Sequence, residues 1–394
     1  GTNHYFTSAS PSADAITIVG DSSGSSSSSA EGIRIENSSG QHEFVATGVG
    51  GGVNITSKAG TNDTEGLQFN DPIYVLANGG DINISVASGS TSARFYSDSG
   101  GDLTLGYTDA ANTNYDLTSS TSNITLNSSG SYLYSGEISA NTSGGNFILS
   151  GDTDNSGVGT LRMAGGLDIN THGGNITLGG GNSLGTGYAI GEDISDRTEG
   201  IRIDKILNLN SEGGNILLKG KTSTRSESTS GYGNSGVGVY YLDSAGLIDS
   251  GTGTITIEGI NQNATGATTY SSGVLFALNG NNKTTITSSS TVSSAIQITG
   301  KGTGTSRTIV GMEVETSSPL SILATGDGGG ISLSTGQSST STGDKYDFIA
   351  RSTFELLAKD GPINMTSIED GAEEGILYFS SLPYFGSRAG SSIT

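Results

Sequence analysis

Three polar residues near position 150 have the type and spacing of calcium ligands. Asp152, Asp154 and Asn155 belong to the run Asp-Thr-Asp-Asn-Ser-Gly, which begins like a calcium-binding loop. Carboxylate and amide oxygens are ligands that Ca²⁺ takes in proteins, and a complete loop of this kind adds a bidentate glutamate at its far end. No glutamate stands at that distance here. These three residues are therefore the calcium candidates, with an ordinary loop as the alternative.

The other residues that could take part in catalysis are scattered. His4, His42 and His172 lie far apart, in the N-terminal segment or in expected turns, and none has a serine or aspartate at a spacing typical of a triad. His172 is expected at an exposed corner. A second acidic group, interpreted as a solvated connection, consists of Glu369, Asp370, Glu373 and Glu374. We expect no catalytic residue, and no cofactor unless the loop at Asp152 binds calcium.

Asparagines followed by x-Ser or x-Thr are frequent and could accept N-linked sugars. They include Asn54, Asn83, Asn123, Asn141, Asn175 and Asn364. Most of them fall in a repeated Asn-Ile-Thr sequence that strand formation alone explains, so glycosylation is the alternative interpretation.

Composition excludes several classes of protein. Glycine supplies 64 of 394 residues and proline only 5, whereas a disordered chain would be richer in proline and charge. The net charge of −21, from 17 basic and 38 acidic residues, repels nucleic-acid phosphates and anionic lipids. We expect no nucleic-acid partner. Membrane insertion is not expected either, because no apolar run approaches the ~20 residues that span a bilayer.

The chain contains no cysteine. Disulfides, thiolate metal sites and cysteine nucleophiles are therefore excluded. An exported protein without cysteine is typical of bacteria, where long surface fibres often lack disulfides. We expect an extracellular or cell-surface location, with any export signal removed or lying outside this sequence.

A repeated unit of three short strands must position these residues. In its clearest copy, strands at 67–69, 73–75 and 82–84 start six and then nine residues apart. Further copies with this spacing start at Tyr132, Leu161, Ile201 and Phe348. Looser copies start at Ile33, Val239, Val274 and Met312, and their third strands are expected at Val53, Ile255, Ile286 and Ile331.

Three apolar-x-apolar strands per unit predict a three-faced coil. Each strand would pair in parallel with the same face of the coils above and below, and no single coil could bury its own apolar face. We expect an all-β, right-handed parallel β-helix of about eleven coils of roughly 28–40 residues. This β-helix is expected over residues 31–380. Residues 1–30, rich in serine, are expected to form a linker, cap or joining strand, and residues 381–394 a C-terminal tail.

A Gly-Gly pair usually precedes the third strand and marks a corner. Glycine accepts positive φ at little cost, which suits a sharp turn between two faces. The residues that follow such pairs are Asp81, Asp102, Asn146, Asn175 and Asn215. Their side chains are expected to bond their own turns or to stack into a ladder.

These repeats resemble those of a family of bacterial surface proteins. Gly-Gly-Asn-Ile-Thr-Leu at 173–178 and Gly-Gly-Asp-Ile-Asn-Ile at 79–84, with relatives at 100–105 and 213–218, are similar to repeats of filamentous-haemagglutinin-type adhesins and of autotransporter passenger regions. The resemblance covers residues 30–380 in outline. It implies an exported surface fibre that mediates adhesion, aggregation or biofilm formation.

Two functions are left open. The first is an extracellular structural or adhesive fibre protein that assembles end to end into a filament or matrix, or binds a surface glycan or protein receptor. The second is a polysaccharide-processing enzyme of the lyase or glycosidase type, because such enzymes also use β-helices. Enzymes of that type need clustered carboxylates, whereas here the acidic residues are scattered and tryptophan is absent. We expect that the chain is not an enzyme.

Overall fold

The structure is a computed structural model that describes most of the chain. The described residues are 4–26, 32–35, 42–58, 65–69, 73–86, 92–95, 103–106, 123–128, 132–134, 138–153, 155–182, 184–192, 198–205, 207–223, 234–242, 246–262, 270–277, 283–304, 308–315, 319–339, 344–368, 377–379 and 383–387. Asp102, Asp154 and the acidic group at 369–374 lie outside these ranges. The predictions made for them stay predictions.

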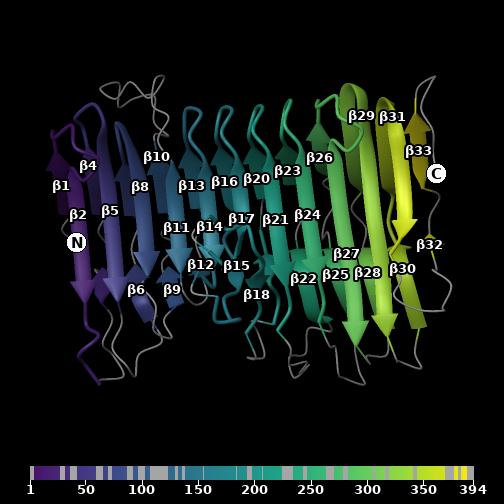
Figure 1. The fold of residues 1–394 in the computed structure, drawn as a ribbon, viewed down its shortest axis with the longest axis horizontal. Coiled ribbons are helices and arrows are strands. Elements are labelled where there is room, and N and C mark those ends of the chain that lie inside the picture. The colour runs from purple at the N-terminus through teal and green to yellow at the C-terminus, as the bar shows by residue number, and fades with distance from the viewer. Residues whose placement is uncertain are drawn as a thin grey trace.

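The described strands form one stack of parallel coils, in which most strands pair with the strands one coil before and after them. Figure 1 shows the strands following one another along the long axis of the molecule in sequence order, with the two termini at opposite ends. No helix occurs in the described ranges. The predicted all-β parallel β-helix is confirmed.

The first face of the coil is a separate sheet of eleven strands. Its strands are β3 (Ile33–Ile35), β6 (Glu65–Phe69), β9 (Ser92–Phe95), β12 (Tyr132–Tyr134), β15 (Leu161–Met163), β19 (Ile201–Ile203), β22 (Asn234–Leu242), β25 (Tyr270–Ala277), β28 (Thr308–Glu315), β30 (Asp344–Ala350) and β32 (Leu377–Phe379).

The second and third faces together make the larger sheet. The second face contains β1 (His4–Ser8), β4 (His42–Ala46), β7 (Ile73–Leu76), β10 (Leu103–Gly106), β13 (Ile138–Asn141), β16 (Leu167–Asn170), β20 (Leu207–Asn210), β23 (Gly246–Asp249), β26 (Thr284–Ser288) and β33 (Tyr384–Ser387). The third face contains β2 (Ile16–Asp21), β5 (Gly51–Lys58), β8 (Gly79–Val86), β11 (Ile124–Ser128), β14 (Phe147–Gly151), β17 (Ile176–Gly180), β21 (Ile216–Lys221), β24 (Ile255–Ile260) and β27 (Ile296–Gly304).

Two long strands and one short one complete the larger sheet. β29 (Leu320–Ser339) and β31 (Phe354–Ser367) continue through the corner, so that each contributes its first part to the second face and its last part to the third. The short β18 (Ala189–Ile190) pairs with the end of β21.

The core consists of columns in which one inward side chain stacks on the next. On the third face one such column is unbroken and contains Ile82, Ile124, Phe147, Ile176, Ile216, Ile255, Ile296, Ile331 and Ile363. All of these side chains are buried. Strands of alternating apolar and polar residues form this fold because each inward apolar side chain packs on the apolar side chain of the next strand, ~4.8 Å away.

One predicted strand position is wrong. Ile286 was expected on a third strand, but it pairs with Ile248 and Ile322 on the second face, and the third strand of that coil starts at Ile296. The Ser-rich run between β26 and β27 is longer than in most other coils, so the expected spacing of nine residues between the second and third strands does not hold there.

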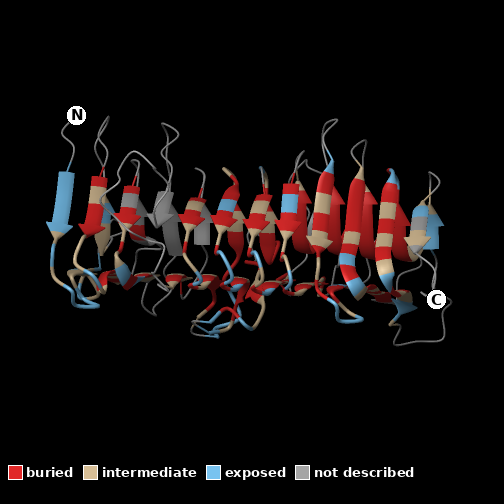
Figure 2. Cartoon of the chain, turned by 90° about the horizontal axis from the view of Figure 1, so that it is seen from above, coloured by how far each residue is buried: buried red, intermediate tan, exposed pale blue. Residues whose placement is uncertain are grey.

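The stack is also longer than residues 31–380. β1 and β2 pair with β4 and β5, so the serine-rich N-terminal segment contributes strands to the second and third faces. β33 pairs with β31, which places part of the expected tail on the second face. Figure 2 shows burial along the middle of the stack and exposed strands at both ends.

Candidate functional site at the polar corners of the coils

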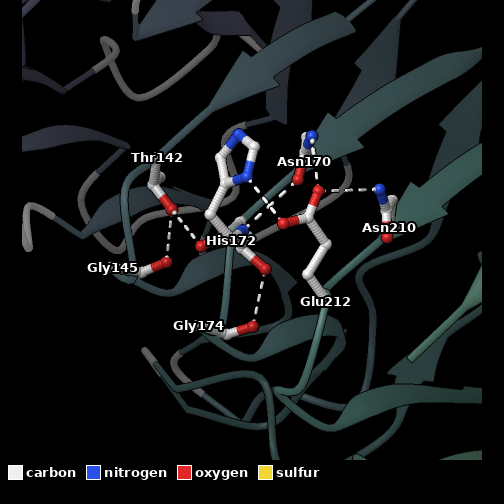
Figure 3. A network of polar contacts seen from close by, with 8 residues as sticks. Thr142, Gly145, Asn170, His172, Gly174, Asn210 and Glu212 are labelled. Atoms are coloured by element: carbon white, nitrogen blue, oxygen red, sulfur yellow. Dashed lines mark hydrogen bonds and ion pairs between the residues drawn. The ribbon is translucent and has the colours of Figure 1, made fainter. Parts of the chain in front are cut away.

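The corner between the second and third faces is held by a column of buried hydroxyls. In four successive coils a Ser or Thr follows the second strand and donates a hydrogen bond to a glycine carbonyl three residues later. These pairs are Thr142 with Gly145, Thr171 with Gly174, Ser211 with Gly214 and Ser250 with Gly253, at 2.5, 2.6, 2.5 and 2.8 Å. Figure 3 shows the first of them. The hydroxyl satisfies a carbonyl that the turn leaves without a strand partner.

The second glycine of each corner lies against the corner of the coil before it. A Cβ placed on Gly214 would lie 1.9 Å from the carbonyl oxygen of Gly174, and a Cβ on Gly174 would lie 2.0 Å from that of Gly145. No side chain fits at such distances, so the coils can stack at this corner only with glycine. The Gly-Gly pairs are therefore required for packing at this corner.

An amide ladder runs along the start of the third face. It contains Asp81, Asn123, Asn146, Asn175, Asn215 and Thr254. Each side-chain oxygen up to Asn215 accepts a hydrogen bond from the backbone N–H of the ladder residue in the next coil, at 2.8–2.9 Å. The predicted ladder is confirmed for Asp81, Asn146, Asn175 and Asn215. These hydrogen bonds join two coils, whereas bonds within one turn were the other expectation.

A histidine and a glutamate of adjacent coils contact each other at this corner. His172 and Glu212 occupy equivalent positions of adjacent coils, and the imidazole Nδ1 lies 2.9 Å from Glu212 Oε2. Asn170 and Asn210 donate hydrogen bonds to Glu212 Oε1 at 3.5 and 3.3 Å (Figure 3). The exposed position predicted for His172 is confirmed. The amides of Asn170 and Asn210 orient the carboxylate of Glu212 but do not titrate. The pair of His172 and Glu212 therefore serves to hold two coils together, and we call it the clasp.

Both residues of the pair have left-handed backbone conformations. The φ of His172 is 46° and that of Glu212 is 54°, while the equivalent position of the next coil is Gly251 with φ 55°. A non-glycine residue in this region is strained by about 1 kcal/mol or more. The hydrogen bond between His172 and Glu212 and the two amide contacts offset part of this strain.

We expect the stabilising effect of Glu212 to depend on pH. The hydrogen bond from His172 lowers the pKa of Glu212, so its contribution is present above the unfolded pKa of about 4.3 and is lost as pH falls through the lower folded value. Glu212→Gln should lower the thermal midpoint at about pH 6 and have little effect at about pH 3. Circular dichroism melts at both values test this, and an equal loss at both would contradict the electrostatic account.

A second polar cluster lies on the outer side of the first face and was missed from the sequence. Arg202 donates to Asp204 at 2.6 Å through Nε and to Glu199 at 3.2 Å through Nη1. Arg162, one coil earlier, lies 4.0 Å from Asp204, and the Arg202 guanidinium lies 5.3 Å from the ring centre of Tyr240 in the following coil. The signal available was the arginine at the middle of Leu-Arg-Met and Ile-Arg-Ile, at the same position in consecutive coils.

Glu199 is the most deeply buried member of this cluster, with a side chain only 5% exposed. Burial raises the pKa of its carboxyl group, and the nearby charge of Arg202 acts in the opposite direction. A carboxyl group with a raised pKa could serve as a general acid. Here, however, one oxygen is bound to Arg202 and the group is shielded from bulk solvent, so the cluster has the geometry of a buried ion network.

Further ion pairs link coils elsewhere. Glu313 on β28 accepts hydrogen bonds from Ser272 of the preceding coil and Arg351 of the following coil, at 3.0 and 3.2 Å. Glu258 accepts a hydrogen bond from the hydroxyl of Tyr188. Its Oε2 lies 3.2 Å from Nζ of Lys219 in the preceding coil. These contacts have the same role as the corner ladder.

Of the three calcium candidates, the structure describes Asp152 and Asn155, and Asp154 lies outside the described residues. Asp152 is buried, and its Oδ1 accepts hydrogen bonds from Ser156 Oγ and the Gly157 N–H, both at 3.0 Å. Asn155 is exposed, and burial raises the pKa of Asp152. No group of three or more His, Cys, Asp or Glu suited to a metal occurs within the described ranges. Asp152 Oδ1 holds its own loop closed, whereas Oδ2 is buried without a hydrogen-bond partner. The prediction that these residues bind calcium stays a prediction.

We expect the unfolding temperature to be insensitive to calcium. Adding millimolar Ca²⁺, or removing it with a chelator, should leave the thermal midpoint unchanged, because the accepting oxygen of Asp152 is already hydrogen bonded. Differential scanning fluorimetry with Mg²⁺ as the control measures this. A rise of several degrees specific to Ca²⁺ would show that the loop binds the ion.

The other two histidines lie together at the N-terminal end of the stack. His4 starts β1 and His42 starts β4, and their rings stack with centres 5.1 Å apart. His4 lies in the N-terminal segment, as expected, and begins a strand there. The turn expected at His42 was wrong, because this residue also begins a strand. His172 lies in a different part of the chain, so the histidines form no common site.

Comparison with known proteins assigns the chain to no family. No family model, no curated protein and no solved structure matches the chain. The described segments also include no helix long and apolar enough to cross a membrane.

Proposed function

We propose that the chain is a structural or adhesive fibre protein of the cell exterior, without enzymatic activity. The observation that carries this proposal is the use of its polar side chains. The amide ladder, the clasp of His172 and Glu212, the contact of Arg202 with the Tyr240 ring, and the contacts of Glu313 with Ser272 and Arg351 all connect one coil to the next. A rod whose polar groups are engaged in its own stacking is suited to extend and to bear load.

The acidic surface and the absence of cysteine support the same proposal. A net charge of −21 keeps a strand-rich rod soluble, and a chain without cysteine can be exported without forming disulfides. The partners that we propose are other copies of the chain, or a glycan or protein receptor on a neighbouring surface. Nucleic acid is not among them.

The competing function is processing of a polysaccharide, with Glu199 as the acid. Incubating the purified protein with acidic and neutral polysaccharides, then measuring both retained protein and newly formed sugar ends, separates the two functions. We expect either no interaction or binding without cleavage. Cleavage that disappears in Glu199→Gln but persists in Glu212→Gln would overturn the proposal and identify an enzyme.

A further inference from the structure

We propose that a hollow on the outer side of the second face binds a sugar unit of a neutral polysaccharide. This inference rests on the proposed adhesive function and specifies its ligand class and binding site. The hollow has a volume of about 510 Å³ and crosses β29, β31 and β33, which lie next to one another (Figure 1). Its lining includes Leu323, Leu357, Thr325, Lys359, Tyr384 and Gly386.

The floor of the hollow is more apolar than the preceding part of its column. Leu323 and Leu357 are paired on adjacent coils and face outward, because their neighbours along each strand are buried. From β13 to β26 the same outward column contains only polar residues, which are Asn141, Asn170, Asn210, Asp249 and Thr287. Both leucines are partly exposed, and β33 pairs with β31 beyond them. An apolar floor therefore lies within the described stack, where the preceding coils provide amides, a carboxylate and a hydroxyl.

A glycine opens the space above this floor. Gly386 follows Leu357 in the column, and a Cβ at this position would lie 2.5 Å from a terminal methyl of Leu357 and 3.3 Å from the ring of Tyr384. The absence of a side chain leaves room between the tyrosine ring and the leucines. A tyrosine ring supplies a rigid apolar surface with a polar tip. The C–H groups on one side of a sugar ring can pack on such a surface, while the hydroxyls of the sugar point towards the rim.

Polar groups at the rim can bond the hydroxyls of a sugar. Lys359 has three N–H donors, and its Nζ lies 2.5 Å from Asp327 Oδ1. The hydroxyl of Thr325 donates to the carbonyl oxygen of Ser288 at 3.2 Å, so its own oxygen remains an acceptor. A sugar hydroxyl both donates and accepts, and this rim offers a group of each kind. An apolar surface with a few such polar groups is typical of small-ligand pockets, whose volumes are about 300–1,000 Å³.

Charge balance favours a neutral sugar over an acidic one. Lys359 is the charged residue of the lining, and Asp327 neutralises it. Glu355, which pairs with Tyr384 in the sheet, is itself neutralised by Lys283 at 3.0 Å. The hollow therefore carries no net charge, while the chain as a whole carries −21 and repels acidic sugars. A neutral sugar avoids that repulsion and needs no unpaired cation in its site.

Binding of soluble polysaccharides to the full-length chain tests the site. The neutral probes are dextran, mannan and galactan, and the acidic probe is polygalacturonate. Affinity electrophoresis measures binding, and an assay for newly formed sugar ends in the same mixtures measures cleavage. Each probe is compared between the wild type and three variants.

Two of the variants change the hollow, and the third is a matched control. Leu357→Asn gives the floor the residue type that the column carries at Asn210, and Tyr384→Ala removes the aromatic wall. Leu247→Asn makes the first of these changes at an exposed leucine elsewhere on the second face. Circular dichroism melts verify that each variant folds. The two site variants alter different strands, β31 and β33, so a folding defect in one leaves the other able to test the site.

We expect the wild type to bind at least one neutral polymer, and both site variants to weaken this binding about tenfold or more. Leu247→Asn should bind as the wild type does. The site would be overturned by no binding to any neutral polymer, by binding to polygalacturonate alone, or by binding that Leu357→Asn and Tyr384→Ala leave unchanged. None of these outcomes bears on whether the chain forms fibres, which electron microscopy detects. Cleavage of a polymer would instead overturn the proposed function, whether or not the hollow binds that polymer.

Discussion

Gly214→Ala should be among the most damaging single substitutions in the chain. The added Cβ would lie 1.9 Å from the carbonyl oxygen of Gly174 and 2.3 Å from its carbonyl carbon, both backbone atoms of the adjacent coil. Because a backbone cannot rotate aside as a side chain does, the two coils must separate at this corner. Overpacking of this kind costs about 3 kcal/mol. We expect a clear fall in the urea midpoint, measured by circular dichroism.

Gly24→Ala provides the matched control for this substitution. A Cβ at Gly24 would meet no heavy atom within 4 Å, and its φ does not lie in the left-handed range. The same chemical change should therefore leave the urea midpoint within the error of the wild type. Equal losses in the two variants would show that the effect of Gly214 does not come from contact between coils, because the lower entropy of the unfolded chain would by itself raise the midpoint.

Arg202→Met should destabilise the chain by a similar amount for a different reason. Glu199 is buried, and its pKa is already raised by burial against the opposing charge of Arg202. Removing the cation leaves a buried carboxylate with no partner of opposite charge in hydrogen-bond reach among its described contacts. Breaking one side of a buried pair costs about 3–5 kcal/mol. We expect a large fall in the urea midpoint at neutral pH.

The pH dependence identifies the cause of that loss. A carboxyl group whose folded pKa is raised destabilises the folded state above its unfolded pKa of about 4.3, and the penalty disappears below it. The defect of Arg202→Met should therefore shrink as pH falls to about 4. Adding Glu199→Gln should restore much of the midpoint at neutral pH. If the double variant were as unstable as the single one, the loss would come from packing of the arginine stem and not from charge.

The fold could be predicted because its signals are periodic. Apolar and polar residues alternate in strands such as Ile82-Asn83-Ile84, the spacing between strands repeats, and Gly-Gly pairs mark one corner. Each coil therefore shows the same pattern as the coil before it. Ile286 was misplaced because the connection to the next strand is longer in that coil. β1, β2 and β33 were not recognised as parts of coils because they belong to none of the complete three-strand units that the spacing defines.

The polar contacts could be predicted only where the repeat carried them. Asn146 and Asn175 follow Gly-Gly pairs and were expected to stack, which they do. The cluster of Glu199 and Arg202 depends on how a connection between the third and first faces folds back, and connections vary in length from coil to coil. Asp152 also lies in such a connection, and its carboxylate accepts hydrogen bonds from its own loop. The prediction that it binds calcium stays a prediction.

Electron cryomicroscopy of the purified full-length protein tests the central claim most directly. A stack that joins its copies in series predicts thin unbranched fibres, much longer than the roughly 50 Å of about eleven layers, with a repeat of ~4.8 Å along the fibre axis. Chelator should leave these fibres intact. Separate short rods at all concentrations, or fibres whose axial repeat is not that of stacked strands, would contradict the account of this chain as a fibre protein.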